Sequence, residues 1–220
     1  GVTSDPTSGE YVVPDDMPTD GGSWTISRNP QTGELEMSFE VDFTSISVRE
    51  NDVSTSLTAT APGDIEITEI YGGMGVDKVS SANNGDISLS VPEGDLVDSN
   101  PSADGLNIST GGDAKLDVPK GSIGSDEDPV DVEIGGTLTT NSQSDTFITT
   151  GEDLTMVGDS LEGELNVQAD KDLELSNTKG DLKASELDVG GDLKVTSPDG
   201  STNIDKLHVG GILTMDSQGD

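Results

Sequence analysis

Residues 187–195 read LDVGGDLKV, and residues 207–215 read LHVGGILTM, so the same pattern returns after twenty positions. An earlier copy of its second half, DLEL, stands at residues 172–175. A fixed period of this length is typical of architectures that stack one small unit on the next. Within each unit the apolar residues alternate with polar ones, which is the period of a β-strand. The stretch therefore predicts an all-β fold, a parallel β-helix or β-solenoid.

The same unit continues toward the N-terminus in a less regular form. Gly-Asp or Gly-Gly pairs followed by a short apolar strand begin at residues 63, 85, 112 and 135. Because these intervals exceed twenty residues, we expect the extra residues to loop out at the turns, over 98–105 and 122–129. Counting from residue 63 gives about eight coils. Stacking at about 4.8 Å per strand predicts a rod of about 40 Å.

The texture of the chain changes along its length. We expect four parts: an extended leader over 1–22, an N-terminal β cap over 23–62, irregular coils with turn insertions over 63–151, and regular coils over 152–220. The last part breaks off just after a new strand unit begins, so we expect the chain to be a piece of a longer protein.

The N-terminal cap is predicted to be a β-hairpin. Residues 35–43 alternate strictly between apolar and charged or polar residues, and a turn-like stretch at 29–33 separates them from a shorter alternating run at 24–27. A bend is expected near Thr44. The aromatic residues of this part are either a binding surface or a hydrophobic plug over the first coil. We favour the plug, because the ends of solenoids need caps.

The charge of the chain excludes several functions. It has 220 residues, 10 Lys and Arg against 44 Asp and Glu, and a formal net charge of -34. Nucleic-acid binding depends on basic residues that neutralise phosphates, so we expect no nucleic-acid partner. An anionic membrane surface is disfavoured in the same way, and no apolar run is long enough to insert into a membrane. Cations, basic partners or a salty medium fit this charge better.

Hydrophobic residues make up 30% of the chain, and there is no cysteine. The low apolar content is also typical of disordered chains. The patterned apolar residues favour instead a thin solenoid core, which needs only small columns of Val, Leu and Ile. A disulfide framework is excluded.

Two motifs suggest calcium. Residues 72–80 match one nonapeptide of calcium-binding β-rolls, including Asp77, but such sites need tandem copies. Asp98, Asn100 and Asp104 alternate like the first ligands of an EF-hand loop, although the glycine and the closing glutamate are missing. These four residues are the candidate metal ligands, and solvated turns are the alternative. No other cofactor is expected.

Catalysis has little support in the sequence. His208 is the only histidine and lies between two apolar residues of a strand, so it should point outward. Arg28 and Arg49 are the only arginines. No nucleophile elbow, phosphate loop or zinc spacing is present, and we expect no enzyme. The sequon at residues 107–109 is one that such a chain carries by chance.

The regular coils resemble a known family. Residues 167–182, VQADKDLELSNTKGDL, and residues 189–195, VGGDLKV, are similar to the repeat regions of large bacterial filamentous adhesins, the filamentous-haemagglutinin and leukotoxin-like surface proteins. The resemblance covers about residues 63–220. It implies a right-handed parallel β-helix displayed on, or shed from, the cell surface. The net charge exceeds what this family leads us to expect, which leaves room for a salt-adapted organism.

We therefore expect a structural or adhesive segment of a large extracellular or cell-surface protein. Its partner would be a component of a host or neighbouring-cell surface. One alternative is a self-assembling surface-layer, sheath or bactofilin-like filament, whose copies bind end to end. A second alternative is a carbohydrate-active or phage-tailspike β-helix.

Overall fold

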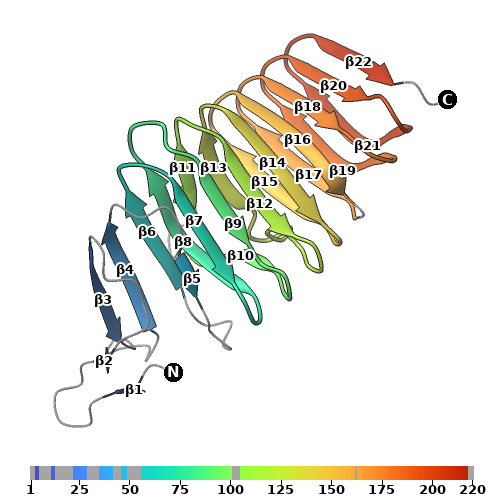
Figure 1. The fold of residues 1–220 in the computed structure, drawn as a ribbon. Helices are drawn as coiled ribbons and strands as arrows, with labels where there is room; N and C mark the ends of the chain where they lie inside the picture. Colours follow the sequence, from blue (N-terminus) through green and yellow to red (C-terminus); the bar gives the residue numbers. More distant parts are fainter. Residues whose placement is uncertain are drawn as a thin grey trace.

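The computed structural model describes residues 3–4, 11–12, 22–28, 35–41, 46–48, 56–100, 105–161 and 163–217, with side chains over 56–100, 105–158 and 163–217. All the regular elements in these ranges are β-strands. Apart from the small pair of β1 (Thr3–Ser4) and β2 (Tyr11–Val12), the strands form two long sheets (Figure 1).

The first sheet has eleven strands. Their bounds are β3 (Gly22–Arg28), β4 (Leu35–Val41), β6 (Ser56–Ala61), β8 (Met74–Ser81), β10 (Leu96–Asp98), β11 (Ile108–Thr110), β13 (Val130–Ile134), β15 (Thr146–Thr150), β17 (Leu165–Ala169), β19 (Leu182–Val189) and β21 (Thr202–Val209).

The second sheet has nine strands. They are β5 (Ile46–Val48), β7 (Ile65–Glu69), β9 (Ile87–Ser90), β12 (Ala114–Val118), β14 (Thr137–Ser142), β16 (Leu154–Leu161), β18 (Leu173–Asn177), β20 (Leu193–Ser197) and β22 (Leu213–Ser217).

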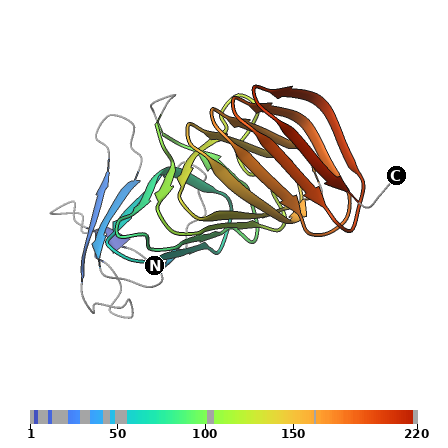
Figure 2. The same cartoon turned by 90° about the horizontal axis from the view of Figure 1, so that it is seen from above.

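The chain alternates between the two sheets, and each coil contributes one strand or interrupted strand to each of them. From β6 and β7 to β21 and β22 this makes eight coils, stacked in chain order with parallel neighbours (Figures 1 and 2). The predicted β-solenoid of about eight coils is therefore confirmed. The two sheets face each other, so each coil is a flattened loop rather than a round one (Figure 2).

The core lies between the sheets and is built from alternate residues of each strand. In β18, Leu173 and Leu175 are buried while Glu174 is exposed. Leu173 pairs in register with Leu193, and Leu175 with Val195, so like residues stack from coil to coil. Each coil therefore buries the next, and long-range stacking, not local propensity, stabilises the rod.

The predicted insertions are accommodated outside the strands. Ile65, Ile87, Ala114 and Leu138 occupy successive positions of one buried column, although the spacing between them varies. In the later coils Leu154 and Leu173 share a column. One difference is that Leu138 pairs with Met156 and not with Leu154, because β16 is shifted by two residues against β14.

The predicted hairpin is present at the level of strand pairing. β3 and β4 are antiparallel, with Trp24 opposite Phe39. β4 then runs parallel to β6, so the hairpin extends the first sheet directly. β6 lies within the range expected for the cap, yet it already belongs to the first coil. The hairpin turn, the bend near Thr44, most of the leader and the side chains of the expected plug lie outside the described residues.

Candidate functional site

Two consecutive coils leave the first sheet at the same place. β8 pairs with β10 through residues 74–76 and with β11 through residues 79–81, so the chain between β10 and β11 leaves the sheet. In the next coil Ile123 bridges to both Leu96 and Thr146, and the chain then departs until β13 begins at Val130. The described residues of these departures, 99–100, 105–107 and 124–129, are called the stacked loops below. They lie near the extra residues predicted over 98–105 and 122–129, although Asp98 belongs to β10 and Ile123 forms bridges to both neighbouring coils.

Asn107 closes the base of the first stacked loop and is completely buried. Its Nδ2 donates hydrogen bonds to the Val76 carbonyl oxygen at 2.8 Å and to Asp98 Oδ1 at 2.5 Å. Its Oδ1 accepts the main-chain N–H of Asp131 at 2.8 Å. One side chain thus joins three successive coils. The asparagine of the sequon is therefore a structural group inside the fold.

Asp98 anchors the other side of the loop. Only 9% of its surface is exposed, and its Oδ1 also accepts the Asn100 N–H at 2.6 Å. Burial raises the pKa of the Asp98 carboxyl, against the opposing effect of hydrogen bonds from Asn100 and Asn107. The negative charges of Asp128 and Asp77 raise this pKa further. The base of the stacked loops is therefore acidic and partly desolvated.

Three of the four candidate calcium ligands, Asp77, Asp98 and Asn100, lie in the described residues and make hydrogen bonds to protein groups. Asp77 lies in β8, where its Oδ2 accepts the Thr58 hydroxyl at 2.9 Å. Asn100 reaches the same residue through a different atom, donating from Nδ2 to the Asp77 carbonyl oxygen at 3.1 Å. Asp98 bonds to Asn107, and Asp104 lies outside the described residues. Within the described ranges no three His, Cys, Asp or Glu side chains are placed to hold a metal ion, and calcium remains a prediction.

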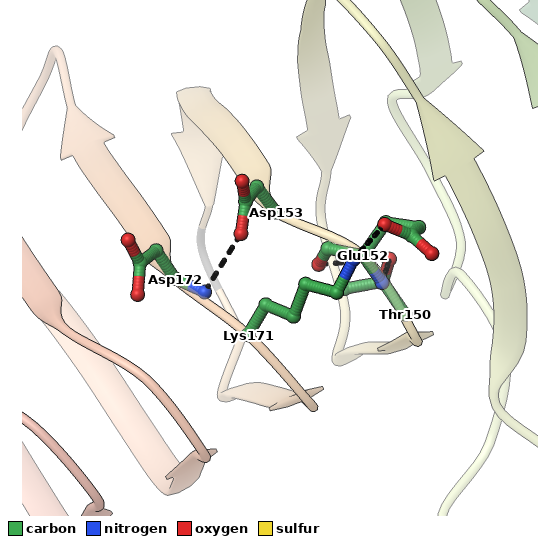
Figure 3. Close-up of polar contacts among 5 residues, drawn as sticks. All are labelled: Thr150, Glu152, Asp153, Lys171 and Asp172. Atoms are coloured by element: carbon green, nitrogen blue, oxygen red, sulfur yellow. Dashed lines mark hydrogen bonds and ion pairs between the residues drawn. The ribbon is translucent and has the colours of Figure 1, made fainter.

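The Gly-Asp pairs have a structural role that their spacing alone did not reveal. The aspartate side chain accepts the main-chain N–H of the equivalent residue in the following coil. This contact recurs in one row of turns from Asp64 to Asp86, Asp86 to Asp113, Asp113 to Thr137, Asp153 to Asp172, Asp172 to Asp192 and Asp192 to Ile212. Figure 3 shows the contact between Asp153 and Asp172, at 3.2 Å. Each carboxylate thus satisfies a turn N–H that has no strand partner.

The opposite turns contain a second row of the same kind. There the pairs are Asp95 with Ser122, Asp145 with Glu164, and Asp181 with Ser201. Both rows are called the aspartate latches below.

At several latch positions the preceding glycine leaves room for the carboxylate of the preceding coil, whereas Asp172 is preceded by Lys171. A Cβ on Gly191 would overlap Asp172 Oδ1, and one on Gly211 would overlap Asp192 Oδ1. The requirement here is close approach, since neither glycine has a positive φ. At Gly191-Asp192, for example, the aspartate accepts a main-chain N–H of the following coil, and the glycine leaves room for the carboxylate of the preceding coil.

Ion pairs add a further contact between neighbouring coils. In each described pair the lysine lies one coil after its glutamate: Lys120 with Glu93, Lys171 with Glu152, Lys194 with Glu174, and Lys206 with Glu186. The hydrogen bond from Lys171 to Glu152 raises the pKa of the lysine (Figure 3). These side chains are about half exposed or more, so solvent weakens each pair. Each pair nevertheless joins two neighbouring coils in the same direction along the chain.

The single histidine lies on a strand of the last described coil. His208 lies in β21, is exposed as expected, and stands in register beside Asp188 of β19. Arg28 lies in β3, and Arg49 is outside the described residues.

Comparisons with known proteins found no matching family model, no matching curated protein and no matching solved structure. The part of the chain that the structure describes contains no helix long and apolar enough to cross a membrane.

Proposed function

We propose that this chain is a stiff, acidic structural segment of a large extracellular or cell-surface protein, related to the filamentous adhesins. The observation that carries the proposal is the pair of parallel sheets that continue through eight coils. Bending such a rod would stretch main-chain ladders, aspartate latches and core columns together. A stiff rod is suited to hold a binding surface away from its attachment point.

The stacked loops are the proposed adhesive surface. Binding residues are commonly carried on loops that a rigid scaffold positions. Asp126, Glu127 and Asp128 are all exposed on the second loop. Their charge would attract a basic component of a host or neighbouring-cell surface.

Two separate measurements test the rod and the adhesion. Small-angle X-ray scattering should give an elongated particle, with the eight coils contributing about 40 Å. A compact globule in solution would contradict the rod. Adhesion is measured as binding of the folded chain to beads coated with basic proteins and to intact cells.

The adhesion test compares two variants that remove the same number of charges. D126N/E127Q/D128N changes the second stacked loop, whereas E66Q/E133Q/D188N changes exposed carboxylates elsewhere. Loss of binding in the loop variant alone supports the proposal. Equal loss in both variants would show non-specific charge attraction, and the absence of binding by the unmodified chain would remove the adhesive role while leaving the rod intact.

A second candidate function is end-to-end assembly into a filament. The inward columns of the last described coil are open, with Leu207 42%, Leu213 43% and Met215 46% exposed. Another coil could stack there and bury them. Light scattering with and without calcium and high salt distinguishes this candidate, because persistent monomers under all conditions exclude it.

A further inference from the structure

Three neighbouring strands, β14, β16 and β18, place a column of polar or glycine residues in the core. Thr140 pairs in register with Gly158, and Gly158 with Asn177. The three residues therefore occupy the same position in three consecutive coils. Gly158 is buried, and Thr140 and Asn177 are both 0% exposed.

Each of the two polar side chains in this column has one unsatisfied atom. Thr140 Oγ1 and Asn177 Oδ1 have no hydrogen-bond partner among the described protein groups. The orientation of the Asn177 amide is explained by its Nδ2, which donates to the carbonyl oxygens of Lys179 at 3.1 Å and Gly180 at 3.0 Å. Its Oδ1 is thereby left as an acceptor inside the solenoid.

Several other buried hydroxyl groups are paired, although Thr202 Oγ1 is also buried without a hydrogen-bond partner among the described protein groups. Thr110 Oγ1 donates to the Gly85 carbonyl oxygen and accepts the Gly112 N–H. The Ser142 and Thr146 hydroxyls bond to each other at 2.8 Å. Buried polar groups are almost always hydrogen-bonded to protein or to ordered water, because an unsatisfied one is costly.

Gly158 places no side chain between Thr140 and Asn177. The pairing of β14 with β16 also shifts register between Thr140 and Asn141, so the column lies at an irregular point of the sheet. A buried water molecule typically makes about three hydrogen bonds to polar groups that would otherwise be unsatisfied. A water beside Gly158 could donate to Asn177 Oδ1 and bond to the Thr140 hydroxyl.

We propose that a single water molecule binds in the core beside Gly158, between Thr140 and Asn177. This site is independent of the proposed adhesive role. It joins the side chains of two coils across Gly158 of the coil between them, at the point where the strand register changes.

The test combines a high-resolution crystal structure of the unmodified chain with the melting temperature of Thr140→Val. The proposal expects a water peak within hydrogen-bonding distance of both Thr140 Oγ1 and Asn177 Oδ1. It also expects Thr140→Val to lower the melting temperature, because the water would lose a partner. If the hydroxyl is instead buried without a partner, the same substitution should raise the melting temperature.

Thr110→Val is the matched control. It removes a buried hydroxyl with protein partners, and it should lower the melting temperature in either case. Absence of the water peak, or a higher melting temperature for Thr140→Val, would each overturn the proposal. The crystal structure decides the matter even if the valine variant does not fold.

Discussion

The Asp172 carboxylate accepts the main-chain N–H of Asp192, one coil further along, at 2.7 Å. Asp192 makes the same contact to Ile212, also at 2.7 Å. This forward bond recurs along the solenoid and couples the turns as the main-chain ladders couple the strands. It explains the aspartate at this position of the repeat, which follows Gly191 at Asp192 but Lys171 at Asp172.

Removing one latch should weaken the rod measurably. We expect Asp172→Ala to lower the free energy of unfolding by about 1 to 2 kcal/mol, because the Asp192 N–H loses a charged acceptor. Urea denaturation followed by circular dichroism measures this. Asp188→Ala, at an exposed strand position, is the control and should change stability by less than about 0.5 kcal/mol. Equal effects of the two substitutions would show that the latch contributes nothing.

The glycine partner of the latch should be equally sensitive. A Cβ on Gly191 would overlap the Asp172 carboxylate and approach the main chain of residues 171 and 172. We expect Gly191→Ala to cost about 1 to 3 kcal/mol, as overpacking does elsewhere. In Gly151→Ala the nearest atom would be 4.0 Å away, so this control should be nearly neutral. If Gly191→Ala and Gly151→Ala both have the melting temperature of the unmodified chain, a Cβ at Gly191 does not crowd the Asp172 carboxylate.

Asn107 should be the most sensitive polar residue at the stacked loops. Asn107→Asp removes both Nδ2 bonds and places a second carboxylate against buried Asp98. We expect a loss of about 3 kcal/mol or more in unfolding free energy, because a buried charge without a partner is costly. Asn141→Asp, which disrupts a less buried bond to Asp117, is the matched control and should cost much less. A small effect of Asn107→Asp would mean that water solvates the new carboxylate, and it would contradict the burial of this side chain.

The raised pKa of Asp98 predicts a specific pH dependence. Because the folded state holds this proton more tightly than the unfolded state, Asp98 destabilises the fold increasingly as the pH rises above its ordinary value of 3.8. Asp98→Asn keeps an acceptor for Asn100 and Asn107 but cannot ionise. Its stability relative to the unmodified chain should therefore rise between pH 3.8 and neutral pH. Thermal melts across this range measure the difference, and a flat difference would contradict it.

Salt should stabilise the rod, because it screens the repulsion within a chain of net charge -34. We expect the melting temperature to rise from low to high potassium chloride. Calcium chloride at matched ionic strength distinguishes screening from binding. An extra rise in melting temperature with calcium that Asp77→Asn and Asp98→Asn abolish would support the predicted metal ligands. Equal melting temperatures in the two salts would contradict calcium binding at these residues.

Much of the fold could be predicted because, in a solenoid, residues that are one repeat apart in the sequence contact each other in neighbouring coils. Leu173 and Leu193 are twenty residues apart, which is one repeat, and they stack on each other in neighbouring coils. The two insertions were also visible, since extra residues between stacked strands must leave the sheet. The adhesin resemblance, the surface location and the partner depend on properties that no strand pattern contains, and they remain proposals.

The candidate site was harder to predict than the fold. Asp98 and Asn100 were expected as metal ligands because of their alternation, but the bonds of Asp98 to Asn107 depend on how the loop closes. Asn107 was read as a chance sequon, and only its contacts with Val76 and Asp131 in other coils show its role.

The sequence by itself determined the solenoid, its coil number and the places where the chain departs from it. These follow from periodicity, because each coil buries the same faces as its neighbours. The tertiary structure alone decided which polar groups meet between coils: the aspartate latches, the Asn107 bridge and the buried pair of Thr140 and Asn177. Such contacts depend on the register and depth of each side chain, which are set when the coils stack.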